Sequence, residues 1–532
     1  MQQALSLLSG LLVGIGLRAA HGSQSICEHF ALRNVPGVAL AGTTYYPANA
    51  TVDIGNDYMA INSSALPAFC RVQLLVTTNE TAGSSANTEV WLPDEWNGRM
   101  LTIGNGGFAG GADVLGLGNQ AVSQGFAGVS TNTGHNSSAV AAEWAGPHND
   151  NALIDFGWRA VHLSVLAGKE VTKQYYNKVP KRSYYLGCSM GGRQGLKEIQ
   201  EFPDSFDGVV VGDPANWMSR TMTWNTHLSL NVMPRNSSRF IPLEVWRNVI
   251  KPEVMRQCDA LDGVTDGIIN DPRLCDFQPE LLRCRPKQDP STCLNADQIQ
   301  VLRRVYADYY ETDQTYVFGG LNPGGEDEYY GSYLNGAPLP AATPWIRYVV
   351  LNDTEWTPDQ WDSNLFKIAD EINAGQANAI NPNLIPFGGP PHDGKLLHFV
   401  GLVDERISPR NSFHYYQTVL EHTLGNSMLN IDDFYRLFPA PGVKHCFGGP
   451  GANAFGSLFH PPSLSPGPEH NILSAMIRWV EEGVAPTQIV AAKYKNDNPS
   501  EGVAFTRPLC KWPTTVKYLG GDPNDAGSFI CS

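Results

Sequence analysis

The sequence predicts an α/β protein, with a mostly parallel sheet covered by helices on both faces and one large insertion. Three observations lead to this prediction. Short apolar runs that end in glycine-rich turns recur along the chain, and helix-like stretches separate them. This alternation stops near residue 216 and resumes near residue 395. Strands that alternate with helices pair in parallel, and buried parallel strands appear in sequence as continuous apolar runs.

The predicted strands fall on both sides of the insertion. Residues 99–103 precede a Gly-Asn-Gly-Gly turn, and residues 126–130 precede Thr-Asn-Thr-Gly. Glycine and asparagine clusters of this kind mark the ends of strands. Three further apolar runs are predicted as strands, at residues 183–186, 208–211 and 396–400.

Helices are predicted between these strands and after the last of them. Residues 155–171 form one helix that covers the sheet. Near the end of the chain, residues 471–482 place Ile472, Met476 and Val480 on one stripe, and Gly483 follows as a stop signal. We expect this last helix to belong to the core.

An irregular segment separates the two groups of strands. Residues 216–394 are rich in Trp, Pro, Asp and Gly without clear periodicity, and they contain four of the ten cysteines. Because the regular alternation stops at one end and resumes at the other, we interpret this segment as an inserted domain. The catalytic domain then consists of residues 23–215 and 395–532.

The first residues predict export from the cell. Residues 1–22 contain an apolar run followed by small residues around Ala20, the pattern of a secretory signal peptide. A buried N-terminal helix is the alternative. No later segment reaches the ~18 apolar residues of a membrane-spanning helix, so no membrane partner is expected.

Cysteine and asparagine patterns also favour a secreted, extracellular eukaryotic protein. The cysteine number is even and no Cys-x-x-Cys occurs, which favours disulfides over metal thiolates. Six Asn-x-Ser/Thr sequons predict a glycoprotein, at Asn49, Asn62, Asn79, Asn136, Asn236 and Asn352.

The charge balance limits the class of partner. The chain has 37 basic and 52 acidic residues, a formal net charge of -15. Such a protein is not attracted to phosphate backbones or anionic membrane surfaces, so nucleic acid is not an expected partner. A neutral or apolar substrate fits better.

Ser189 is the candidate nucleophile. It stands in Gly187-Cys188-Ser189-Met190-Gly191, between a predicted strand and a predicted helix. In Gly-x-Ser-x-Gly, the glycines allow a strained turn that lifts the hydroxyl out of the sheet, while the helix start directs N–H groups at the reacting oxygen. An ordinary turn is the alternative interpretation.

A serine nucleophile needs a base and an acid that orients the base, and in α/β-hydrolases these follow in the order serine, acid, histidine. Asp404 lies just past the strand at residues 396–400, with Glu405 as the rival acid. His445 lies in a flexible loop 41 positions later (445 minus 404). Either residue alone reads as a solvated aspartate or a structural histidine; the order and placement favour a triad.

Backbone N–H groups of Met190 and Gly107 are the candidates for an oxyanion hole, because the residue after the nucleophile and a glycine-rich loop usually supply the two donors. A plain glycine turn is the alternative for Gly107. Residues 116–121 imitate a dinucleotide fingerprint but lack the acid ~20 residues later. No His-Glu-x-x-His occurs, so neither an organic cofactor nor a zinc hydrolase is expected.

The segment from Gly187 to Gly192, together with Asp404 and His445-Cys446, resembles the Cys-Ser, Asp, His-Cys pattern of the tannase and feruloyl esterase family, in particular feruloyl esterase B. These are fungal secreted serine esterases. The resemblance implies an α/β-hydrolase catalytic domain with a large inserted lid domain. It also implies five disulfides: Cys188–Cys446, Cys27–Cys70, Cys258–Cys275, Cys284–Cys293 and Cys510–Cys531.

The resemblance further implies a structural calcium ion in the lid. The matching segment offers three carboxylates and two backbone carbonyls, from Asp259, Asp262, Asp266, Val264 and Ile268. Oxygen atoms of this kind are the ligands that calcium prefers. The carboxylate spacing departs from the EF-hand pattern, and a solvated Asp-Gly turn is the alternative.

The expected function is hydrolysis of feruloyl, or other hydroxycinnamoyl, esters of plant cell-wall polysaccharide such as xylan, through Ser189, His445 and Asp404. Hydrolysis of galloyl esters by a tannase is the close alternative. An alternative of another class is a noncatalytic binding protein on a hydrolase-like scaffold.

Overall fold

The computed structural model describes residues 22–146 and 149–532, and these form two compact units. The first unit comprises residues up to 105 together with 109–139 and 151–184; the second comprises 106–108, 140–150 and 185–532. The predicted signal peptide, residues 1–22, lies outside the described residues except for Gly22.

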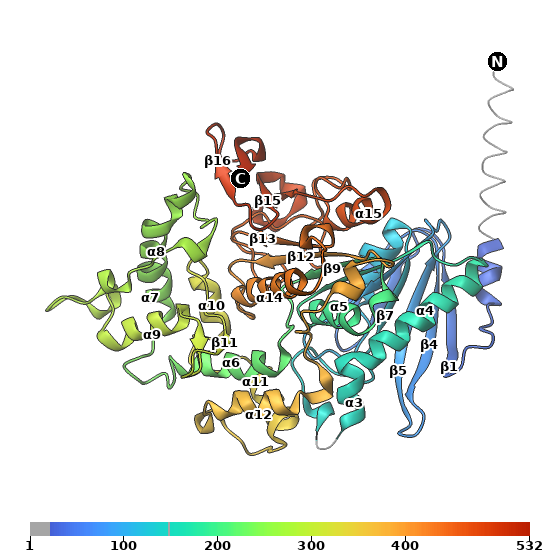
Figure 1. Ribbon diagram of the computed structural model, residues 1–532, viewed down its shortest axis with the longest axis horizontal. Coiled ribbons are helices and arrows are strands. Elements are labelled where there is room, and N and C mark those ends of the chain that lie inside the picture. The colour runs from blue at the N-terminus through green and yellow to red at the C-terminus, as the bar shows by residue number, and fades with distance from the viewer. Residues whose placement is uncertain (1–21, 147–148) are drawn as a thin grey trace. The chain divides into compact units, whose positions relative to one another are not determined.

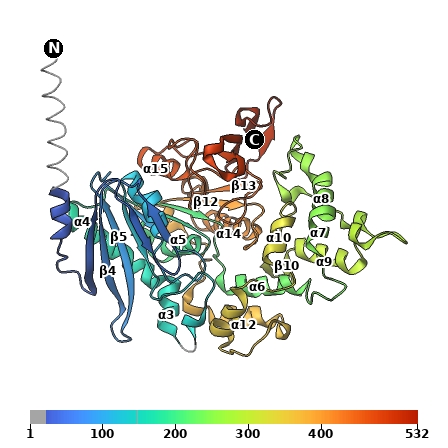
Figure 2. The same cartoon turned by 180° about the vertical axis from the view of Figure 1, so that it is seen from behind.

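The first unit is built on a twisted run of strands in the order β1-β4-β5-β7-β6. The first four pair antiparallel, whereas β6 and β7 pair in parallel. Helix α4 packs against β4, β5 and β7 and covers one face, as the two opposite views show (Figures 1 and 2). The bounds are β1 Val38–Tyr46, β4 Phe69–Asn79, β5 Ser84–Pro93, β6 Arg99–Ile103, β7 Ala127–Thr131 and α4 Ala160–Tyr176. Smaller elements are β2 Val52–Gly55, β3 Ala60–Ser63, α2 Val114–Gly116 and α3 Asp150–Ile154, the last of which begins at the boundary with the second unit.

The second unit contains the parallel strands that bear the candidate site. They lie in the order β8-β9-β12-β13, and β12 pairs in parallel with both β9 and β13. Every residue of β9 and β12 is buried, as expected for strands covered on both faces. The bounds are β8 Arg182–Cys188, which begins in the first unit, β9 Gly208–Gly212, β12 Lys395–Gly401 and β13 Tyr435–Ala440.

Three helices accompany these strands. Helix α5 (Met190–Glu201) packs on β9, α14 (Arg410–Asn426) follows β12, and α15 (Ile472–Glu482) packs on β9 and β12. Asn471 caps α15 by accepting the N–H of Ser474, and Gly483 ends it in the left-handed conformation. The predicted strands and the last helix are therefore confirmed within one or two residues, and so is the α/β class. Helix α4 has 17 residues, as predicted, but begins five residues later than expected, after a separate helical turn at Asp155–Arg159.

The segment between β9 and β12 is mainly helical and has a core of its own, in which Trp224, Trp246 and Phe318 are fully buried. It is drawn in green through yellow to light orange in Figure 1. Division by contacts leaves this segment in the second unit, so the predicted domain boundaries at residues 216 and 394 stay a prediction. Its elements are α6 Met218–Leu230, α7 Leu243–Val245, α8 Lys251–Cys258, α9 Ala296–Tyr306, β10 Tyr309–Tyr310, β11 Tyr316–Phe318, α10 Glu326–Ser332, α11 Ala342–Trp345, α12 Asn364–Ile372 and α13 Ile385–Gly388.

The C-terminal part adds two small hairpins, β14–β15 and β16–β17. Their bounds are β14 Gln488–Tyr494, β15 Val503–Cys510, β16 Val516–Tyr518 and β17 Phe529–Cys531.

All ten cysteines form disulfides, in the five pairs that the family resemblance implies. Five of the six glycosylation sequons have an exposed asparagine, and Asn79 is partly buried. Among the described residues, no helix combines the length and hydropathy needed to cross a bilayer.

Candidate active site

Ser189 occupies a strained turn between β8 and α5. Its backbone has φ 61° and ψ -121°, a conformation that non-glycine residues rarely adopt. Two backbone hydrogen bonds hold it there: Ser189 N donates to Gly212 O at 2.9 Å, and Ala215 N donates to Ser189 O at 3.1 Å. The end of β9 and the turn after it therefore hydrogen-bond to both the N–H and the carbonyl of Ser189, and Ser189 remains partly exposed.

Ser189, His445 and Asp404 form a continuous chain of hydrogen bonds. The Ser189 Oγ lies 2.8 Å from His445 Nε2, and His445 Nδ1 lies 2.7 Å from Asp404 Oδ2. The other Asp404 oxygen accepts the N–H groups of Arg406 and Ile407 at 2.7 and 2.9 Å. Because a carboxylate only accepts, Nδ1 carries the imidazole proton and Nε2 is left to accept the serine proton.

The environment of His445 favours its charged form. Burial alone lowers the pKa of the imidazole, but the charge and hydrogen bond of Asp404, together with the charges of Asp213 and Glu405, raise it by more. The pKa of His445 is therefore raised above its ordinary value of 6.5. A proton taken from serine is stabilised on this ring.

Glu405, the rival acid, has a different partner. Its Oε2 accepts the backbone N–H of His445 at 3.0 Å, and its other oxygen lies 3.5 Å from Arg406 Nε. Glu405 thus supports the backbone of the histidine loop, whereas Asp404 contacts the ring.

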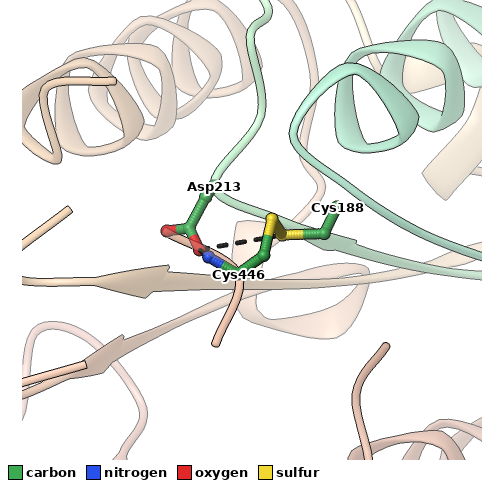
Figure 3. Close-up of side chains that lie close together, drawn as sticks. All are labelled: Cys188, Asp213 and Cys446. Atoms are coloured by element: carbon green, nitrogen blue, oxygen red, sulfur yellow. Dashed lines mark hydrogen bonds between the residues drawn. A yellow bond between two sulfur atoms is a disulfide. The ribbon is translucent and has the colours of Figure 1, made fainter. Parts of the chain in front are cut away.

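Asp213 is a buried acid beside the site that the sequence prediction missed. It directly follows β9, and its carboxylate lies next to the Cys188–Cys446 disulfide (Figure 3). One oxygen of each side chain of Asp213 and Asp404 and one ring nitrogen of His445 lie within 4.8 Å of one another. The reasoning that selected Asp404, a carboxylate just past a buried strand, applies equally to Asp213 and was a usable signal.

The two oxyanion-hole candidates lie in the same unit as Ser189. Met190 is the first residue of α5, so its N–H is among those at a helix start that lack a partner within the helix. Gly107 has φ 56°, which suits a residue without a side chain.

The predicted calcium ligands lie in one loop after α8. Burial raises the pKa of Asp262, and the nearby carboxylates of Asp266 and Asp259 raise it further, against the N–H of Val264. Three carboxylates and two backbone carbonyls are hard oxygen donors of the kind that calcium prefers. In the described structure these carboxylates accept backbone N–H groups: Asp259 from Asp266 and Gly267, Asp262 from Val264, and Asp266 from Ile268. Arg507 also pairs with Asp266, so one side of that carboxylate already has a cationic partner.

Comparison with known proteins shows the family of this chain. A family model described as tannase and feruloyl esterase matches residues 70–358 and 347–532. The chain belongs to the tannase and feruloyl esterase family. It is 38% identical over 481 residues to a probable feruloyl esterase B-2 of Aspergillus flavus, covering 90% of each chain. It is also 35% identical to feruloyl esterase C of Talaromyces stipitatus, covering 98% of each.

Solved structures confirm the fold of this family member. The crystal structure of feruloyl esterase B from Aspergillus oryzae superimposes with a TM-score of 0.88 at 36% identity, covering 96% of this chain and all of that one. Tannin acyl hydrolase from Aspergillus niger gives a TM-score of 0.73 at 22% identity, a likeness of fold alone. The α/β-hydrolase class is thereby confirmed, and the protein is a carboxylic ester hydrolase.

Removing the disulfide beside the site is expected to impair hydrolysis. The Cys188–Cys446 bond joins the neighbours of Ser189 and His445 across 258 positions. Replacing both cysteines by serine frees the histidine loop, so we expect kcat for an aromatic methyl ester to fall about 10- to 100-fold. The stability to denaturant should fall by a few kcal/mol as well, about 2–5 for a native disulfide.

The matched control is Cys284→Ser with Cys293→Ser, which removes a disulfide of sequence separation 9 from the insertion. It should leave kcat near the wild-type value. Equal losses of kcat in the two double variants would show that the active-site disulfide does not position the histidine.

Proposed function

We propose that the protein is a serine esterase that works through an acyl-enzyme, with Ser189 as nucleophile, His445 as base and Asp404 as the orienting acid. The hydrogen-bonded chain at 2.8 and 2.7 Å, on a strained turn between strand and helix, is the observation that best supports this proposal.

In the first stage, His445 Nε2 takes the proton of Ser189 as Oγ attacks the ester carbonyl. The tetrahedral oxyanion is stabilised by the N–H groups of Met190 and Gly107, and its collapse releases the alcohol, which takes the proton from His445. In the second stage, water gives a proton to His445 and attacks the acyl-enzyme. The carboxylic acid leaves and Ser189 regains its proton.

The substrates we propose are feruloyl and related hydroxycinnamoyl esters of plant cell-wall polysaccharide, such as feruloylated xylan. Feruloyl esterases of types B and C are among its relatives at 35 to 38% identity over nearly the whole chain, while the tannin acyl hydrolase is 22% identical. We also propose secretion and glycosylation, since five disulfides suit an oxidising compartment and five sequons are exposed.

Ser189→Ala is the direct test of the mechanism. Without the nucleophile, kcat on methyl ferulate should fall by at least about 10⁴-fold, with the thermal midpoint unchanged. Ser123→Ala, a change of an exposed serine, is the matched control and should retain full activity. Wild-type activity in Ser189→Ala would refute the triad, and an inactive wild-type protein would favour a noncatalytic binding function.

Substrate preference is tested by comparing kcat/KM for methyl ferulate and methyl gallate, with Ser189→Ala as the background for each. The two acids differ in the propenoate spacer between ring and carbonyl, so a pocket built for one misplaces the carbonyl of the other. We expect a higher kcat/KM for methyl ferulate. Turnover of methyl gallate alone would instead assign the chain to the galloyl branch.

We further propose that the loop of Asp259, Asp262 and Asp266 binds calcium with the carbonyls of Val264 and Ile268. A bound ion would offset the burial, and the repulsion by Asp266 and Asp259, that raise the pKa of Asp262. Calcium at 100 times its Kd should then stabilise the fold by about 2.7 kcal/mol, seen as a higher thermal midpoint in calcium than in chelator.

Asp262→Asn should lose most of this response. Asp289→Asn is the control, because Asp289 caps a separate exposed turn of the insertion. Identical midpoints for the wild type in calcium and in chelator would count against a structural ion.

A further inference from the structure

Asp213 lies where the loops of the candidate triad meet. It follows Gly212, the last residue of β9, and stands inside the turn that clasps Ser189 through Gly212 and Ala215. Its side chain is buried, with 1% of its surface exposed, and its backbone has φ 38°. An aspartate in a left-handed conformation is uncommon and indicates a constraint set by its surroundings.

Both carboxylate oxygens of Asp213 accept backbone N–H groups from other loops. Oδ1 accepts from Gly401 N at 2.7 Å, at the end of β12 just before Asp404. Oδ2 accepts from Cys446 N at 2.8 Å, in the residue that follows His445. A single side chain therefore ties the turn behind Ser189 to the strand end before Asp404 and to the loop of His445.

The disulfide and Asp213 together fix the position of Cys446. Figure 3 shows the Cys188–Cys446 bond on one side of Cys446 and the Asp213 carboxylate at its backbone nitrogen. Cys446 itself has φ 63°, so the histidine loop turns sharply at this point. The covalent bond fixes the side chain of Cys446, and Asp213 fixes its backbone.

Asp213 also brings a second acid to the imidazole. Burial and the charge of Asp404 raise the pKa of Asp213 above its ordinary value, whereas His445 and the N–H groups of Gly401 and Cys446 lower it. In return, Asp213 is among the charges that raise the pKa of His445, after Asp404 and ahead of Glu405. A proton on His445 thus favours the ionised form of Asp213, and the ionised form stabilises that proton.

We infer that Asp213 is a positioning residue for the reaction: it holds the histidine loop against the strand ends and places a second carboxylate beside the imidazolium. This inference rests on the proposed roles of Ser189 and His445. Asp213 acts through His445, since in the described chain its carboxylate bonds to backbone N–H groups and not to the imidazole ring. Its contribution is largest when His445 carries the proton, which occurs in both stages of acyl transfer.

The test is Asp213→Asn, which keeps the size of the side chain and one acceptor oxygen but removes the charge. With a loosened loop and a less stabilised imidazolium, kcat on methyl ferulate should fall about 10- to 100-fold, with KM little changed. Asp213→Ser, with a smaller hydroxyl that fits the same space, is the second variant should Asp213→Asn not fold, and the same changes are expected.

The pH profile separates this role from a purely structural one. The base must be neutral, so kcat/KM falls as the pH drops through the pKa of His445. The ionised form of Asp213, which a proton on His445 favours, raises this pKa, so its loss should move the acidic limb of the profile to lower pH. Among the described residues, the charged groups that raise the pKa of His445 are Asp404, Asp213 and Glu405, and only Asp213 is changed.

Asp113→Asn is the matched control. Asp113 is also fully buried, burial raises its pKa to about 7, and it caps α2 by accepting the N–H of Gly116 at 2.8 Å. This variant should lower the thermal midpoint without moving the acidic limb. The rate at which a fluorophosphonate probe labels Ser189 should fall in Asp213→Asn and stay unchanged in Asp113→Asn.

If Asp213→Asn has the acidic limb and labelling rate of the wild type while Ser189→Ala is inactive, the role of Asp213 is overturned and the proposed function stands. Full activity in Ser189→Ala would overturn the proposed function and this inference together. A lower kcat in Asp213→Asn with an unmoved acidic limb would also overturn the inference, because the residue would then support only the fold.

Discussion

The strained backbone of Ser189, with its positive φ, is the constraint on which the site depends. A serine does not hold this conformation unaided, and here two hydrogen bonds hold it, one donated by Ser189 N to Gly212 O and one accepted by Ser189 O from Ala215 N. Gly212 ends β9 and Ala215 lies just after it, so the position of the proposed nucleophile is set by the neighbouring strand as well as by its own. The same turn places Asp213 next to the loops of Asp404 and His445. The site therefore requires β9 to lie between β8 and β12 in the sheet.

Asp213, Asp404 and His445 form a buried cluster whose charges would be costly without hydrogen-bond partners, and each of the three side chains has such partners. Both oxygens of Asp213 and one of Asp404 accept backbone N–H groups, and Glu405 accepts the backbone N–H of His445. Asp404 is hydrogen-bonded to the imidazole, whereas Asp213 and Glu405 act on it through the backbone of the histidine loop and through their charges. Such an arrangement favours a proton on the ring and supports its transfer from serine.

The sequence predicted the parts of this site that follow from strand ends and chain order. Ser189, Asp404 and His445 each follow a predicted buried strand or lie in a predicted loop, and the structure brings them together. The disulfide pairs came from the family resemblance, since ten cysteines allow many pairings. The insertion was recognised by its irregular composition, but its helices were not predicted, because aromatic residues on several faces hide the helical period. Asp213 was missed because a triad needs one acid and Asp404 had already filled that place.

Glycines outside the short nucleophile motif show how closely the loops meet. A side chain on Gly192 would place its Cβ 2.6 Å from Gly212 O and 3.0 Å from the Cα of Pro214, so the turn around Ser189 closes only over a glycine. A Cβ on Gly401 would lie 2.5 Å from Lys444 O, so the histidine loop crosses the end of β12 only where a side chain is absent. Gly401 is also the residue whose N–H reaches Asp213. Gly192 and Gly401 therefore both allow the loops around Ser189, Asp404 and His445 to pack closely around Asp213.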